Sequence, residues 1–105
     1  ILAVLENIKV TIQKAILVAG FSLPRGDFEE KLLQKKYNWK KIINNAKEFI
    51  FINSRNDPWG CNDKQGLYMW KKLGGTLILS EKEGHFGSKQ FKQEYKEFRL
   101  LEKML

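Results

Sequence analysis

Two polar residues that follow separate apolar runs could carry out proton-transfer chemistry. Asp57 lies in the segment Asn53–Trp59, and His85, the only histidine of the chain, lies in Glu83–Gly87. Each segment follows a short apolar run that is typical of a strand. An aspartate and then a histidine, one helix–strand unit apart, is the order of the last two members of one type of Ser–Asp–His triad. In such a triad the imidazole takes the proton of the serine and returns it to the leaving group, while the carboxylate orients the ring.

The serine that would complete such a triad is not found in its usual motif. The chain contains no Gly-x-Ser-x-Gly sequence, and the nearest match, Gly20–Leu23, is followed by Pro24 in place of the closing glycine. The motif needs a helix that starts directly after the serine and a close backbone approach at its last position. We therefore expect Phe21 and Ser22 to lie at the rim of a substrate pocket, and we expect the nucleophile to lie elsewhere.

Alternating strand and helix patterns predict the elements that position these residues. Continuous apolar runs predict buried strands at 14–20, 48–52 and 76–80. Helical spacing and capping residues predict helices at 1–6, 27–36, 39–46, 62–73 and 88–105. Strands that alternate with helices form a parallel sheet covered on both faces, and right-handed crossovers bring their carboxyl ends to one edge. The sequence thus predicts a three-layer α/β/α fold with its site at that edge.

Apolar residues recur at helical spacing within the predicted helices. Asn62, with Gln65 three residues later, predicts the start of one helix, and Gly74 with Gly75 predicts its end. The recurring apolar residues are Phe28, Leu32 and Leu33; Trp39, Ile42, Ile43 and Ala46; Leu67, Trp70 and Leu73; and Phe91, Tyr95, Phe98, Leu101 and Leu105.

The composition favours a folded domain without a bound cofactor. The 105 residues are 43% hydrophobic and 12% aromatic, which is enough for a core. The one cysteine, Cys61, excludes an internal disulfide and a cysteine-rich zinc site.

No phosphate-binding glycine loop, dinucleotide fingerprint or His/Cys/carboxylate metal cluster is recognisable, so we expect neither cofactor nor metal. A Cys61–His85 pair would make a thiol hydrolase, but we interpret Cys61 as a small loop residue near the site.

Charge and hydropathy indicate a solvated basic surface. The formal net charge is +7, and the lysines are spread along the predicted helices among Glu and Gln. This distribution does not single out a nucleic-acid face, so we expect no nucleic-acid partner. No apolar run approaches the ~18–20 residues needed to span a bilayer. We therefore expect no membrane partner, and because no secretory signal is visible we expect a cytoplasmic location.

The predicted sheet is thin for an independent domain. Three strands leave two exposed edges, and the chain opens at Ile1 within an apolar stretch. We expect residues 1–105 to form a single unit that is the C-terminal portion of a larger domain, whose N-terminal strands and nucleophile are absent from this chain. Alternatively, a partner chain covers the open edge, which would produce a dimer.

Three segments and one helix resemble a known family. Lys14–Ser22, Ser54–Trp59 and Gly84–Gly87, with the helix at Trp39 between them, are similar to the small serine hydrolases related to retinoblastoma-binding protein nine. These are compact α/β-hydrolases, and the resemblance covers most of this chain but only the C-terminal part, roughly three-fifths, of a family member.

The resemblance implies roles for particular residues. Asp57 would be the triad acid and His85 the general base, and the serine would lie on an earlier strand. Trp59 and Phe86 flank these two positions, where they would either line an apolar acyl pocket or simply pack. The implied substrates are small esters, thioesters or amides.

Two other functions remain as alternatives to a hydrolase. The chain could be a non-catalytic α/β remnant that acts as a protein-binding module, which would dimerise through the open sheet edge. A basic nucleic-acid-binding domain has less support, because no recognised motif accompanies the positive charge.

Overall fold

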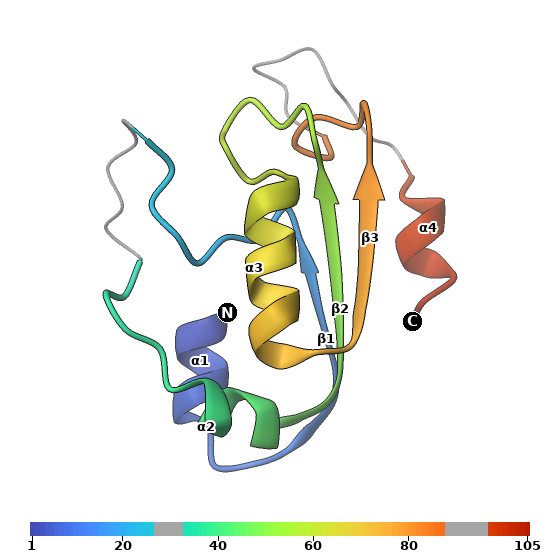
Figure 1. Cartoon of the computed structure of the whole chain (residues 1–105). Coiled ribbons are helices and arrows are strands. Elements are labelled where there is room, and N and C mark those ends of the chain that lie inside the picture. Colours follow the sequence, from blue (N-terminus) through green and yellow to red (C-terminus); the bar gives the residue numbers. More distant parts are fainter. Residues whose placement is uncertain (27–32, 88–96) are drawn as a thin grey trace.

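A parallel three-stranded sheet forms the centre of the computed structural model, which describes residues 1–26, 33–87 and 97–105 (Figure 1). The strands are β1 (Ile12–Val18), β2 (Ala46–Ser54) and β3 (Thr76–Ser80), in the order β1-β2-β3. Because both pairings are parallel, the carboxyl ends of all three strands lie at the same edge of the sheet. The predicted α/β fold with a parallel sheet is confirmed.

The central strand β2 is buried on both faces. Phe51, Ile52 and Asn53 have no exposed surface, and burial continues to the last residue, Ser54. Its run of aromatic and β-branched residues is typical of a strand covered on two sides. The two outer strands each keep one edge that pairs with no other described strand.

Four helices are described around this sheet. They are α1 (Leu2–Asn7), α2 (Trp39–Asn44), α3 (Asp63–Leu73) and α4 (Arg99–Glu102). Figure 1 shows α1 and α3 on one face and α4 on the other. The Lys14 side chain of β1 donates a hydrogen bond to the Met104 carbonyl just after α4, at 2.7 Å. Among the described residues no helix is long and apolar enough to cross a membrane.

Helix α3 begins and ends where the sequence predicts. The Asn62 side chain accepts a hydrogen bond from the Lys64 amide at 3.1 Å, and Gly74 ends the helix with a φ of 73°. The following Gly75 has a φ of 91°, and a Cβ atom there would lie 2.2 Å from the Phe49 carbonyl oxygen. Only glycine therefore fits the turn that leads from α3 into β3.

The buried face of α3 differs from the apolar spacing in the sequence. Leu73 is buried as expected, but Leu67 and Trp70 are 40% and 38% exposed, and Gln65, Gly66 and Met69 face the sheet instead. Gly66 allows this close packing, because a Cβ atom there would lie 2.6 Å from the Asn53 side-chain oxygen. In α2 the prediction for Ile43 is also wrong, since this residue is 41% exposed while Ile42 is buried.

Two predicted helices fall partly outside the described residues. Of the helix expected at 27–36, residues 27–32, with Phe28 and Leu32, lie outside, and residues 33–36 are not helical. Of the helix expected at 88–105, residues 88–96, with Phe91 and Tyr95, lie outside, and the described part is helical only over α4. Phe98 precedes α4 and stacks on Phe86, with ring centroids 5.6 Å apart.

Candidate active site

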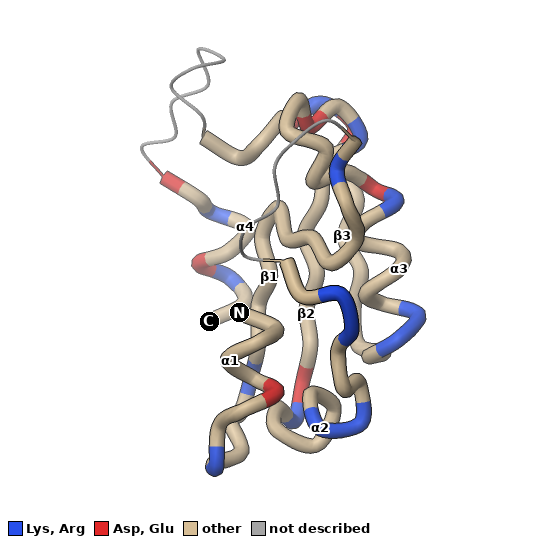
Figure 2. Tube along the Cα trace, turned by 90° about the vertical axis from the view of Figure 1, so that its left-hand side faces the viewer, with Lys and Arg blue, Asp and Glu red and all other residues tan. Residues whose placement is uncertain are grey.

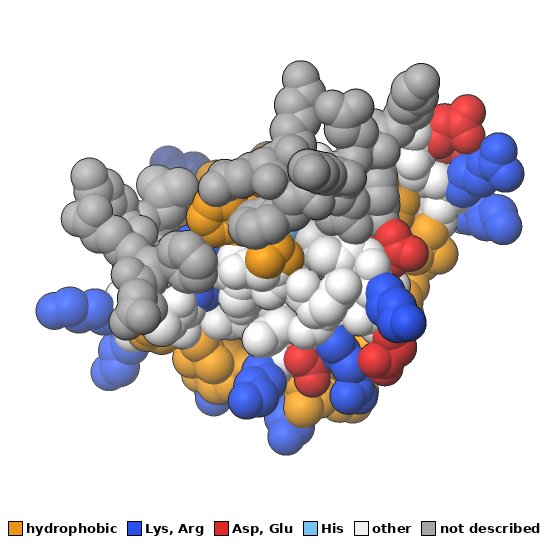
Figure 3. All heavy atoms as spheres, turned by 90° about the horizontal axis from the view of Figure 1, so that it is seen from above, with side chains coloured by type: hydrophobic (Ala, Val, Ile, Leu, Met, Phe, Trp, Pro, Cys, Tyr) orange, Lys and Arg blue, Asp and Glu red, His pale blue; other side chains and the backbone are white. Residues whose placement is uncertain are grey.

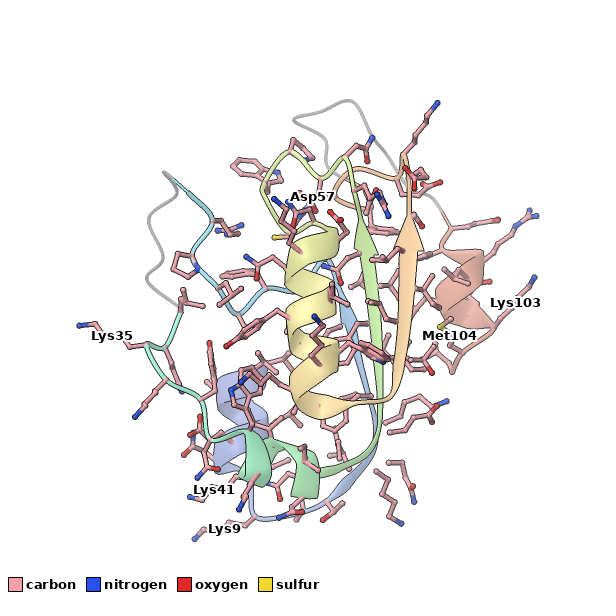
Figure 4. The ribbon with its side chains drawn as sticks, viewed as in Figure 1. Lys9, Lys35, Lys41, Asp57, Lys103 and Met104 are labelled. Atoms are coloured by element: carbon pink, nitrogen blue, oxygen red, sulfur yellow. The ribbon has the colours of Figure 1, made fainter. Side chains whose placement is uncertain are left out.

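The loops at the carboxyl ends of β2 and β3 carry the predicted acid and base. The loop from Arg55 to Asn62 holds Asp57, and Figure 4 shows this residue above the first turn of α3. The loop after β3 holds His85. Figure 3 looks onto this edge, where Lys and Arg side chains lie toward the periphery. Figure 2 shows that the basic residues are spread over α2, α3 and the loops, with acidic residues among them.

Asp57 and His85 form a directly hydrogen-bonded pair. The His85 Nδ1 atom lies 2.8 Å from the Asp57 Oδ2 atom, although 28 residues separate them in the chain. The Asp57 side chain is fully buried, whereas the His85 side chain is 34% exposed. The second carboxylate oxygen, Oδ1, accepts the Trp59 amide at 2.7 Å. A carboxylate held in this way orients the ring so that Nδ1–H donates to it and Nε2 is left as the proton acceptor.

Side chains at the end of β2 and in the loop after it also hold the turn that carries His85. The hydroxyl of Ser54 donates to the Asn56 Oδ1 atom at 2.8 Å and accepts the Glu83 amide at 2.9 Å. Asn56 Oδ1 also accepts the Gly84 amide at 2.7 Å. The side chains of Ser54 and Asn56 therefore bind two consecutive backbone amides of the loop after β3, beside the Asp57–His85 hydrogen bond. These hydrogen bonds hold the backbone directly before His85.

A buried glutamine holds the segment that follows β1. The Gln65 side chain, on α3, accepts the amides of Ser22 and Leu23 at 3.0 Å each and donates to the Leu23 carbonyl at 2.9 Å. The capping-box spacing from Asn62 predicted a different role for this residue. Because Gln65 is only 5% exposed, its amide can satisfy these backbone groups where water cannot reach them easily.

Two further polar residues tie this segment to the acid loop. The Asn53 amide nitrogen donates to the carbonyls of Gly20 and Cys61, at 3.1 and 3.0 Å. Arg25 donates to the Trp59 carbonyl at 3.3 Å, and its guanidinium lies 4.1 Å from the Phe21 ring centroid. Sequence reasoning missed these residues. The one available signal was a polar asparagine at the end of an otherwise apolar, buried strand.

Among the described residues, the four that were predicted to line a substrate pocket lie at different cavities. Ser22 lines a cavity of about 590 Å³ with Tyr37 and Tyr68, and Phe21 lines another of about 350 Å³ along β1. Phe86 lines a third, of about 340 Å³, next to α4. Trp59 lines none of these three cavities. The Ser22 hydroxyl is buried and has no hydrogen-bond partner among the described residues, so it makes no hydrogen bond with His85.

Cys61 lies beside the acid–base pair. It is 1% exposed, and its Sγ atom accepts a hydrogen bond from the Arg25 guanidinium at 3.4 Å. One ligand atom from each of Asp57, Cys61 and His85 lies within 4.8 Å of the other two. No metal cluster was recognisable in the sequence, because the histidine lies in a loop after a different strand from the loop that holds Asp57 and Cys61. The fold therefore brings together three metal-ligating side chain types that sequence spacing did not reveal.

Comparison with known proteins assigns the chain to a family. A family model described as serine hydrolase matches residues 1–103. The crystal structure of the ydeN gene product from B. subtilis is similar, with a TM-score of 0.79 and 22% sequence identity. That match covers 98% of this chain but 55% of the ydeN product, so the chain spans about half the length of the structure that it resembles. No curated protein matches the chain. On the family match over nearly its whole length, the chain belongs to the serine hydrolase family.

Proposed function

We propose that this chain supplies the acid and the base of a Ser–His–Asp triad that hydrolyses small esters, thioesters or amides. The observation that carries the proposal is the 2.8 Å hydrogen bond from His85 to the buried Asp57 carboxylate. His85 Nε2 takes the proton of the attacking serine and then delivers it to the leaving group, and Asp57 stabilises the imidazolium that forms. A water molecule activated by the same imidazole then hydrolyses the acyl-serine intermediate.

The nucleophilic serine, in this proposal, belongs to a part of the protein outside this chain. Residues 1–105 would be the C-terminal portion of one hydrolase domain, as in the small hydrolases related to retinoblastoma-binding protein nine that the motifs resemble. The edge of β1 that pairs with no described strand supports this idea, because the cavity of about 350 Å³ lies between α1 and residues 16–21. A further parallel strand paired with β1 would end at the same edge as Asp57 and His85, and could present a serine there.

Kinetics of the complete protein test this proposal. Sequencing the coding DNA upstream of Ile1 would identify a Gly-x-Ser-x-Gly serine, and ester hydrolysis and labelling by a fluorophosphonate would then be measured. We expect His85→Ala to lower kcat/KM by about 10⁴-fold or more, with folding retained. Glu81→Gln serves as the matched control, because Glu81 is an exposed residue of the same loop, paired with Arg55. Full activity of His85→Ala would refute the triad.

The free β1 edge also supports a second candidate function. An unpaired strand edge can accept another chain, so the protein could be a non-catalytic binding module that dimerises through β1. Light scattering distinguishes the two ideas. A dimer that forms without hydrolase activity in the complete protein would favour the binding module, whereas a monomer that reacts with the fluorophosphonate would exclude it.

A further inference from the structure

Three different metal-ligating groups converge at the edge of the sheet. Asp57, Cys61 and His85 each present one ligand atom, and these atoms lie within 4.8 Å of one another. Asp57 and Cys61 are 7% and 1% exposed, so the cluster is sheltered from solvent on their side. His85 is the half-exposed member, with 34% of its side chain accessible. The triad chemistry uses two of these residues and leaves the thiol of Cys61 without a role.

The donor set matches one class of metal ion. A sulfur, an imidazole nitrogen and a carboxylate oxygen are ligands of Zn²⁺, whereas Mg²⁺ and Ca²⁺ prefer oxygen alone. Bonds of about 2.0–2.3 Å in tetrahedral geometry place ligand atoms roughly 3.3–3.8 Å apart. Atoms that are 4.8 Å apart would have to approach by about 1.0–1.5 Å, and the Asp57 Oδ2 and His85 Nδ1 atoms, now 2.8 Å apart, would have to separate if both bind the metal. We propose that Asp57, Cys61 and His85 bind one Zn²⁺ ion, with water in the fourth position.

Neighbouring groups form hydrogen bonds with Asp57 and Cys61, as outer contacts do around the ligands of metal sites. The Trp59 amide fixes one oxygen of Asp57, and the Asn53 side chain holds the backbone carbonyl of Cys61. Arg25 donates to the Cys61 sulfur at 3.4 Å, a hydrogen bond that a metal-bound thiolate can keep. Such outer contacts orient ligands and increase the affinity for the metal.

Zinc binding would switch off the acid–base pair. Coordination releases the thiol proton of Cys61 to solvent, while His85 binds as the neutral ring through one nitrogen and carries its proton on the other. Neither nitrogen of His85 is then free to accept a proton from a serine. This inhibitory consequence rests on the proposed function, but the binding of Zn²⁺ itself does not.

Direct titration tests the site without any need for catalysis. Because the chain has one cysteine and one histidine, no other set of its residues can supply both ligands. We would titrate it with ZnCl₂ by calorimetry and with CoCl₂ by absorption, where a thiolate–cobalt charge-transfer band reports sulfur ligation. Cys61→Ser and His85→Gln remove one ligand each. Asp63→Asn is the matched control, since it removes a neighbouring carboxylate that lies outside the cluster.

The outcomes separate this proposal from the triad. We expect one Zn²⁺ per chain, and we expect Cys61→Ser and His85→Gln to weaken binding by more than the ~10–100-fold that loss of an outer contact costs. The cobalt band should disappear in Cys61→Ser and persist in Asp63→Asn, with circular dichroism confirming that each variant is folded. Absence of binding, or binding that Cys61→Ser leaves unchanged, would overturn the zinc site. Neither result bears on the effect of His85→Ala on hydrolysis.

Discussion

Replacement of Gln65 tests how the segment after β1 is held at the edge of the sheet. Its side chain makes three hydrogen bonds to the backbone of Ser22 and Leu23, all between 2.9 and 3.0 Å. Ser22 is 6% exposed, so the loss of Gln65 leaves a buried N–H group without a partner. An unsatisfied buried donor costs about 1–3 kcal/mol, and each lost hydrogen bond to a partly exposed group costs about 0.5–1.5 kcal/mol.

These contributions predict a large loss of stability. Because water can reach the two Leu23 groups in part, we expect Gln65→Ala to lower the free energy of unfolding by about 2–4 kcal/mol. Total stabilities of small domains are about 5–15 kcal/mol, so this is a substantial fraction. With a urea dependence near 2 kcal/mol per molar, the unfolding midpoint should fall by about 1–2 M.

Urea unfolding of two variants and a control measures this effect. Gln65→Met keeps the length and packing of the side chain but removes every hydrogen bond, so it should lose nearly as much stability as Gln65→Ala. Lys64→Ala alters the exposed neighbour on the same helix and should change the stability by less than ~0.5 kcal/mol. If Gln65→Met is as stable as the native protein, the hydrogen bonds are not what holds the segment, and the reasoning is wrong.

The remaining predictions concern the histidine turn and the turn before β3. Asn56→Ala removes the side-chain oxygen that accepts the Gly84 amide. It should lower kcat of the complete hydrolase by up to about 10²-fold with KM unchanged, because a small misplacement of a catalytic group is enough to slow the reaction that much. An unaltered kcat would exclude a positioning role for Asn56. Gly75→Ala should cost more than ~3 kcal/mol in thermal unfolding, because its methyl group would collide with the Phe49 carbonyl. Gly74→Ala meets no atom within 4 Å, so its cost is the backbone strain at φ 73° and ψ −162°, about 1–3 kcal/mol, which is less than at Gly75; equal losses at both positions would contradict the steric argument.

The strands were more predictable from the sequence than the helices. The predicted strand at 76–80 matches β3, and the run at 48–52 lies within the longer β2. A buried parallel strand needs a continuous apolar run, and few other elements produce one. The extra residues of β2, such as Asn53 and Ser54, are polar and gave no strand signal, although backbone pairing with β3 extends through both.

The inward face of α3 could not be predicted from apolar spacing alone. Leu67 and Trp70 have the right period but are exposed, because a glycine and a glutamine occupy the face toward the sheet. Gly66 permits the close approach to Asn53, and Gln65 turns toward the segment after β1. Gly66 and Gln65 both contact residues that are far away in the chain. Tertiary contacts of this kind override the local apolar pattern.

In the candidate site, the positions of the two loops could be predicted from the sequence, but the contacts that hold the histidine in place could not. Strand order alone predicts that the loops with Asp57 and His85 are neighbours, because parallel strands end at one edge. The placement of the turn that carries His85 depends also on Ser54 and Asn56, which accept backbone amides of the other loop. Every residue except proline has such an amide, so these contacts leave no mark at the partner's position in the sequence. A sequence can therefore identify the reacting side chains, while the residues that aim them become visible only when the chain is folded.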